Sequence, residues 1–151
     1  MIISVIGAGS CDKKTYVLAQ DVGRLVAQSG GILITGGLGG VMEAASKGAN
    51  EAGGIVIGIL PGFSKSDANS YVTIPITTGL SHARNVIVVR SADAVIAVAG
   101  EYGTLSEIAI ALKLGKPVIG INTWQDIEGI VKVDNADDAV AKAIELAGKT
   151  K

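Results

Sequence analysis

The chain has 151 residues, of which 48% are hydrophobic and 3% aromatic, and its formal net charge is −1 at pH 7. This length suits a single domain, residues 1–151, with an aliphatic core, and the lack of basic runs argues against nucleic-acid binding. The single cysteine, Cys11, excludes an intrachain disulfide, and the lack of a leader and of a membrane-length apolar run points to the cytoplasm.

Short apolar runs alternate with longer amphipathic ones from the first residues onward. The short runs predict strands at 2–7, 32–37, 55–62, 94–100 and 117–122. The amphipathic runs predict helices at 15–30, 41–54, 80–92, 104–116 and 135–149, the last capped by Asn135 or Asp134.

Three segments are less regular. The Val-Ile-Val-Val run within 80–92 favours a strand by propensity, but the length of the segment and the need for a crossover favour a helix. Pro75 argues against a central strand at 71–76, so only a short extended piece is expected there. Residues 131–133 are a candidate sixth strand.

The alternation predicts the fold class. Strands that are apolar on both faces and alternate with helices indicate a parallel sheet covered on both sides. We therefore expect a doubly wound, Rossmann-like α/β domain with three layers. In such sheets ligands bind beyond the carboxyl ends of the strands, and glycine-rich turns follow three of the predicted strands, at 7–10, 36–40 and 100–103.

The first two turns lack the features of common nucleotide motifs. Gly7 and Gly9 resemble the start of a dinucleotide fingerprint, but Asp12 stands at its last glycine and no acidic residue ends the second strand. The turn at 36–40 lets the backbone approach an anion at a helix N-terminus, but it has no P-loop lysine. A purely structural role stays open for both turns, and the spacing of Met42 with Ala45 favours the core.

Arg84 lies near the start of its predicted helix, where the helix dipole disfavours a cation. This placement suits a specific role, and a surface ion pair stays open as the alternative. His82 is the only histidine, and a loop or capping role suits it better than that of a catalytic base. With one histidine and one cysteine, no metal site is expected.

The segment 99–107 supports two interpretations. Thr104 and Glu107 have the spacing of a capping box, in which each side chain satisfies a backbone N–H at the helix start. Gly100 and Gly103 also make a loop suited to close phosphate contact. A carboxylate one turn into the helix could then bind ribose hydroxyls or stabilise an oxocarbenium-like centre.

These motifs together resemble those of the LOG (Lonely Guy) or "possible lysine decarboxylase" family. Residues 99–107 are similar to its P-G-G-x-G-T-x-x-E motif, 81–85 to its M-H-x-R-K element, and 36–62 to its glycine-rich turn and methionine helix. Members are Rossmann-like phosphoribohydrolases that release base and ribose 5-phosphate from nucleotides, and they are generally dimeric with the site near the subunit interface. Nothing in the sequence marks a pyridoxal phosphate site, so no cofactor is expected.

The resemblance implies a site. Arg84 and Glu107 match the catalytic pair, and the phosphorylated ligand is a nucleoside 5′-monophosphate or a similar small molecule. The residues expected to contact it are Gly7, Gly9, Ser10, Gly36, Gly37, Gly39, Gly40, Met42, Gly100, Glu101, Tyr102, Gly103 and Thr104.

The departures from the family pattern support a second hypothesis. Ala99 replaces the proline, Glu101 a glycine, and Asn85 the lysine after the arginine. Loss of a cation and gain of a carboxylate should weaken phosphate binding and hydrolysis. The chain also resembles short LOG-like proteins that include molybdenum-cofactor carriers, so a non-catalytic carrier or sensor is the alternative to a phosphoribohydrolase.

Overall fold

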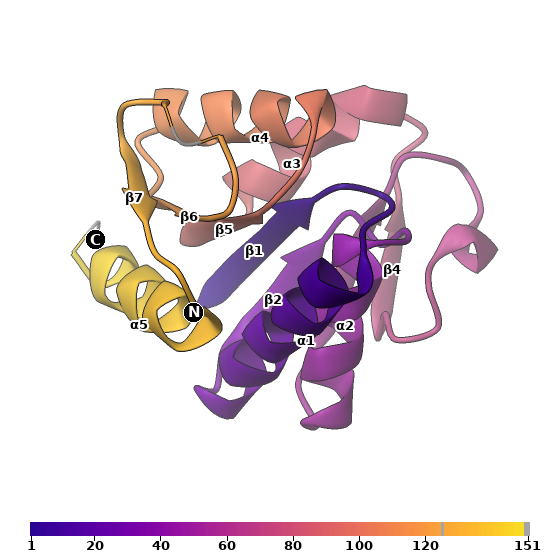
Figure 1. Cartoon of the computed structure of the whole chain (residues 1–151). Helices are drawn as coiled ribbons and strands as arrows, with labels where there is room; N and C mark the ends of the chain where they lie inside the picture. Colours follow the sequence, from indigo (N-terminus) through magenta and orange to yellow (C-terminus); the bar gives the residue numbers. More distant parts are fainter. Residues whose placement is uncertain (125, 150–151) are drawn as a thin grey trace.

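The computed structural model describes residues 1–124 and 126–149, which form one parallel sheet of seven strands flanked by five α-helices (Figure 1). The strands are β1 (Ile2–Gly7), β2 (Ile32–Thr35), β3 (Val56–Leu60), β4 (Ile74–Thr77), β5 (Ala94–Val98), β6 (Val118–Ile121) and β7 (Ile130–Lys132). The helices are α1 (Lys13–Gln28), α2 (Val41–Glu51), α3 (Asn85–Arg90), α4 (Tyr102–Lys113) and α5 (Ala136–Ala147). Short 3₁₀ turns occur at Lys65–Asp67 and Ser81–Arg84.

The sheet has the order β4-β3-β2-β1-β5-β6-β7, and every pairing is parallel. The chain builds outward from β1 to β4, returns to the centre, and then builds outward from β5 to β7. The direction therefore reverses between β1 and β5, which pair from Ile3 with Ala94 to Gly7 with Val98. This switch point is where doubly wound sheets bind ligands.

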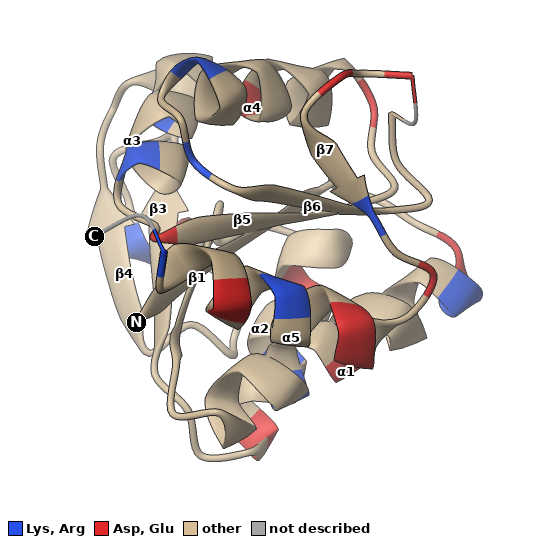
Figure 2. Ribbon diagram, turned by 90° about the vertical axis from the view of Figure 1, so that its left-hand side faces the viewer, with Lys and Arg blue, Asp and Glu red and all other residues tan. Residues whose placement is uncertain are grey.

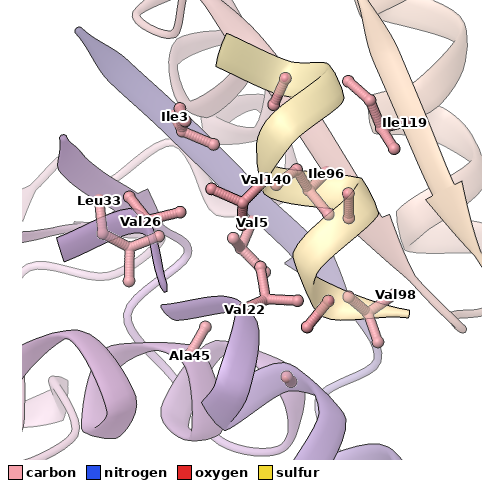
Figure 3. Packing of buried hydrophobic residues seen from close by; sticks show 14 of the residues in the cluster. Ile3, Val5, Val22, Val26, Leu33, Ala45, Ile96, Val98, Ile119 and Val140 are labelled. Atoms are coloured by element: carbon pink, nitrogen blue, oxygen red, sulfur yellow. The ribbon is translucent and has the colours of Figure 1, made fainter. Parts of the chain in front are cut away.

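Helices cover both faces of the sheet, which confirms the predicted three-layer fold. Helices α1, α2 and α5 pack on one face, and α3 and α4 lie on the other (Figure 1). Along β1, Val5 faces the first helix layer and Ile6 the second, because successive strand residues point to opposite faces. Figure 3 shows Val5 packed among Val22 and Val140.

Charged residues stay out of the centre of the sheet. Figure 2 shows β1, β5 and β6 without charged residues, whereas α1 and α5 contain acidic and basic residues. Aliphatic residues thus fill the strands that are buried on both sides, as the sequence indicated.

The edges of the sheet agree with the irregular segments of the sequence. Pro75 lies in β4, an edge strand, where the missing N–H of proline is tolerated. The candidate sixth strand is the opposite edge, β7. Asn135 caps α5, because its Oδ1 accepts a hydrogen bond from the Asp138 N–H at 2.8 Å.

The prediction of one helix over 80–92 was wrong in its start. Ser81 has φ of 52°, a left-handed conformation that no α-helical residue adopts. A 3₁₀ turn, Ser81–Arg84, begins at this residue, and the α-helix begins only at Asn85. This break matters for the site because Arg84 stands at the junction.

Helices α1 and α2 are held at unusually short distance by glycine. A Cβ atom at Gly23 would lie 1.9 Å from the Ala45 carbonyl oxygen, and one at Gly48 would lie 1.8 Å from the Gln20 carbonyl oxygen. The glycines therefore let two helix backbones touch. Both helices begin beside the switch point, so this contact fixes two turns of the site described below.

We predict that Gly48→Ala lowers the free energy of unfolding by about 1–3 kcal/mol, the usual cost of overpacking. Alanine gains up to about 1 kcal/mol over glycine in helix propensity, but the atom in the way belongs to the α1 backbone and cannot rotate aside. Gly148→Ala is the control, because a Cβ there meets its nearest atoms at 3.6 Å. Urea unfolding measures the free energy of unfolding of both variants. Equal stability of Gly48→Ala and the unmodified protein would contradict the close packing of α1 on α2.

Candidate functional site

A cavity of about 250 Å³ opens at the switch point, beyond the carboxyl ends of β1, β2 and β5. Its walls come from the turns after these strands, from the 3₁₀ turn before α3, and from α4. The lining residues are Val5, Ile6, Gly7, Ala8, Gly9, Gly36, Met42, His82, Arg84, Glu101, Gly103, Thr104 and Glu107. The topology thus brings together the three sequence motifs, which are far apart along the chain.

The first wall is made of two interlocked turns. The Val41 N–H at the start of α2 donates to the Ala8 carbonyl at 3.0 Å. Gly40 has φ of 63°, and a Cβ there would lie 2.3 Å from that same carbonyl. Only glycine allows this approach, so Gly40 supports the turn at 7–9 from behind and does not line the cavity.

Arg84 is buried against the second wall, with 8% of its surface exposed. Its Nη2 donates to the Gly36 carbonyl at 3.4 Å and its Nη1 donates to Asn85 Oδ1. Its Nε is buried and has no hydrogen-bond partner among the described residues. A buried N–H donor without a partner costs free energy, and the same residue lines the cavity.

Glu107 faces the same cavity from α4 and is 6% exposed. No hydrogen bond to its carboxyl group occurs within residues 1–124 and 126–149. Burial raises its pKa to about 7, although the positive charge of Arg84 acts in the opposite direction. Burial likewise lowers the pKa of Arg84, against the effect of Glu107. Glu107 can therefore gain or lose a proton near neutral pH, as a general acid or base must.

A chain of hydrogen bonds joins Arg84 to the N-terminal turn of α4. Asn85 accepts from Arg84 through Oδ1 and donates through Nδ2 to Ser106 Oγ at 3.2 Å. Ser106 Oγ in turn donates to the Gly103 carbonyl at 2.6 Å. The residue that replaces the lysine of the LOG pattern is thus already engaged in positioning Arg84 and the loop before α4.

The capping box predicted for Thr104 and Glu107 is wrong. Helix α4 begins at Tyr102, with Glu101 as N-cap and no side-chain cap bond. Thr104 therefore lies inside the helix and is 2% exposed. Gly100 has φ of 106°, and a Cβ there would lie 2.3 Å from Thr104 Oγ1. The threonine packs against this turn, and Glu107, further along α4, lines the cavity.

The structure brings most of the predicted site residues together and leaves six outside the lining. These six are Ser10, Gly37, Gly39, Gly40, Gly100 and Tyr102. Gly37 and Gly100 shape turns through positive φ angles, whereas Tyr102 is 81% exposed at the start of α4. Met42 lines the cavity although its spacing favoured the core. It is 9% exposed, so it packs in the core and also lines the cavity.

Four lining residues were absent from the predicted ligand contacts. Val5, Ile6 and Ala8 belong to the end of β1 and its turn, and their position at the end of a central strand could have indicated them. His82 was considered only as a weak candidate. It belongs to the same 3₁₀ turn as Arg84, and both residues line the cavity.

Within the described residues, no group of three or more histidine, cysteine, aspartate or glutamate side chains is arranged to hold a metal ion. Over the same residues, no helix combines the length and apolar character needed to cross a bilayer.

The fold and site define a Rossmann-like protein with a glycine-walled cavity at its switch point. Residues 1–147 match the family model described as the SLOG cluster4 family, and the chain belongs to this family. A relative from Archaeoglobus fulgidus, of unassigned function, is 51% identical and covers 99% of this chain and 98% of its own. Arabidopsis thaliana cytokinin riboside 5′-monophosphate phosphoribohydrolase LOG2 is 31% identical over 93% of this chain and 66% of its own.

Two solved structures are similar over nearly their full length. The molybdenum cofactor binding protein of Rippkaea orientalis has a TM-score of 0.91 with 37% identity, covering 96% of both chains. The molybdenum cofactor carrier protein of Chlamydomonas reinhardtii has a TM-score of 0.89 with 37% identity, covering 97% of this chain and 98% of its own. The resemblance to both LOG proteins and cofactor carriers is therefore confirmed.

We predict that Gly36→Ala weakens ligand binding at least about tenfold, or 1.4 kcal/mol. A Cβ at Gly36 would lie 2.5 Å from Met42 Sδ and 2.7 Å from Arg84 Nη2, so the guanidinium must move. Isothermal titration with ribose 5-phosphate measures the effect, and the far-UV spectrum checks the fold. Gly148→Ala, remote from the cavity lining, is the control; unchanged affinity in Gly36→Ala would show that Arg84 does not bind the probe.

The raised pKa of Glu107 predicts a specific pH dependence of stability. Its folded-state pKa of about 7 exceeds the ordinary value of 4.5. Protonation of Glu107 therefore contributes fully to the free energy of unfolding below pH 4.5, and this contribution is lost as the pH rises through 7. We expect Glu107→Gln to match the unmodified protein near pH 4 and to be more stable by about 3 kcal/mol at pH 8. Urea unfolding across this range measures the difference, and a pH-independent difference would refute the raised pKa.

Proposed function

We propose that the cavity binds a phosphorylated small molecule, with the phosphate held by Arg84 and by the backbone N–H groups of the glycine turns. The observation that carries this proposal is the Arg84 guanidinium, a cation that lines the cavity and forms no ion pair among the described residues. A phosphate oxygen is a strong acceptor for such a donor. The glycine turns add N–H groups that can approach an anion closely.

We propose hydrolysis of the N-glycosidic bond of a nucleoside 5′-monophosphate as the reaction. Water would add to the anomeric carbon, and the base would leave with a proton, giving free base and ribose 5-phosphate. Ionised Glu107 would bind ribose hydroxyls and stabilise the cationic transition state, while Arg84 holds the phosphate. The name of the LOG relative supports this reaction.

A non-catalytic carrier or sensor is the second candidate, and Asn85 favours it. Asparagine is neutral, and Asn85 bonds to Arg84 and Ser106, so this position supplies no cation to a leaving group or phosphate. The similarity to cofactor carrier structures at 37% identity supports the same interpretation. In this case the cavity would hold a nucleotide or the molybdenum cofactor through its phosphate.

We also propose that the chain acts as one domain in a cytoplasmic homodimer or higher homo-oligomer. Ile74 and Ile76 of the edge strand β4 are 46% and 43% exposed, and Leu80 nearby in the chain is 50% exposed. Apolar side chains gathered at a sheet edge suit contact with another copy.

Base release from a panel of nucleoside monophosphates, followed by chromatography, tests the reaction. We predict release that falls about 10²–10³-fold in Arg84→Ala and Glu107→Gln, the usual effect of losing one transition-state contact. Glu128→Gln, an exposed residue outside the cavity lining, should keep full activity. Binding without release would select the carrier, and neither binding nor release of any phosphorylated probe would contradict the proposed function.

A further inference from the structure

Two parts of the cavity lining come from elements that are separate in the chain. Arg84 ends the 3₁₀ turn Ser81–Arg84, whereas Gly103 and Thr104 lie in the first turn of α4. Helix α3 and strand β5 stand between these two elements in the sequence. A ligand that contacts both needs them at a fixed separation, because displacement of a binding group by about 1 Å can cost about 100-fold in rate.

Asn85 joins the two elements, although neither it nor Ser106 lines the cavity. Its Oδ1 accepts from Arg84 Nη1, and its Nδ2 donates to Ser106 Oγ at 3.2 Å. Ser106 Oγ donates to the Gly103 carbonyl oxygen at 2.6 Å. Asn85 is 6% exposed, so water does not readily replace a hydrogen bond that its amide loses.

Both ends of this hydrogen-bond chain set its direction. A guanidinium has donors and no acceptor, so Arg84 requires an acceptor on the side chain at position 85. A backbone carbonyl has no donor, so the single hydroxyl proton of Ser106 points to Gly103 and its Oγ accepts from position 85. The side chain at position 85 must therefore accept on one side and donate on the other, as the amide of asparagine does.

Other side chains at position 85 satisfy only part of the chain. Leucine branches at the same carbon as asparagine but has neither a donor nor an acceptor. Ionised aspartate accepts from Arg84 but has no donor for Ser106. Lysine, the residue at this position in the LOG pattern, has donors only and would place a second positive charge beside the guanidinium.

From this geometry we propose that Asn85 is a positioning residue of the phosphate site, which holds Arg84 in a fixed place relative to Gly103 through Ser106. The site then depends on the hydrogen-bonding pattern at position 85 and not on its charge. A lysine there weakens phosphate binding, whereas charge alone would make it strengthen binding. The inference rests on the proposed phosphate site.

Isothermal titration of ribose 5-phosphate into three variants tests the inference. We expect Asn85→Leu to weaken binding at least about tenfold, the usual effect of losing a hydrogen bond to a charged group. Asn85→Lys should weaken binding at least as much. Ser106→Ala should weaken it about threefold, since the bonds it removes are between neutral groups. Glu128→Gln, exposed and outside the cavity lining, is the control.

Two further variants separate positioning from a general loss of structure. Ser106→Thr keeps the hydroxyl group and should restore the affinity that Ser106→Ala loses. The double variant Asn85→Leu with Ser106→Ala should bind no more weakly than Asn85→Leu alone, because Ser106 acts on Arg84 through Asn85. Losses that add in the double variant would show two independent effects and would overturn the inference.

Unchanged affinity in Asn85→Leu, or tighter binding by Asn85→Lys, would also overturn the inference while binding by the unmodified protein keeps the phosphate site. Ser106 is exposed, so its variants decide the question if the far-UV spectra show that the Asn85 variants do not fold. Equal affinity in Ser106→Ala and the unmodified protein would then overturn the inference. Failure of ribose 5-phosphate to bind the unmodified protein would remove the proposed function together with the inference.

Discussion

The site depends on the burial of a guanidinium and a carboxyl group in one small cavity. Removing a charge from water costs several kcal/mol unless polar partners replace the lost hydration. Asn85 and the Gly36 carbonyl supply partners to two nitrogens of Arg84, but its Nε has none in the described chain. Glu107 responds to the same burial by a raised pKa. In our proposal, a bound phosphate supplies an acceptor to this guanidinium.

The fold explains why these groups meet. All strands run parallel, so every strand ends at the same edge, and the reversal of winding between β1 and β5 leaves room there. Glycines then let the turns after β1, β2 and β5 approach one another more closely than side chains would allow. Arg84 reaches the cavity because Ser81 breaks the expected helix and a 3₁₀ turn carries the arginine inward.

Much of the fold could be predicted because it depends on local periodicity and strong turn residues. Pro75 identified an edge strand, and the alternation of short apolar and long amphipathic runs predicted the layers. The role of Thr104 could not be predicted from spacing, because the start of α4 depends on the left-handed turn at Gly100. Trp124 lies in a loop without periodicity, and only the pairing of β5 with β6 brings that loop beside Glu101.

Hydrolase and carrier would use the same phosphate site and differ in what surrounds it. Asn85 holds Arg84 in place without adding charge, and Glu101 brings a second carboxylate to the mouth. Both differences from the LOG pattern lower the positive charge of the cavity.

The most direct test of the phosphate site is a ³¹P NMR titration of ribose 5-phosphate with the protein and with Arg84→Ala. The account predicts a saturable shift of the phosphorus resonance with the unmodified protein and no shift with the variant, because the buried guanidinium is the proposed charged partner of the phosphate. A resonance that stays in place with both proteins, or that shifts equally with both, would contradict the account.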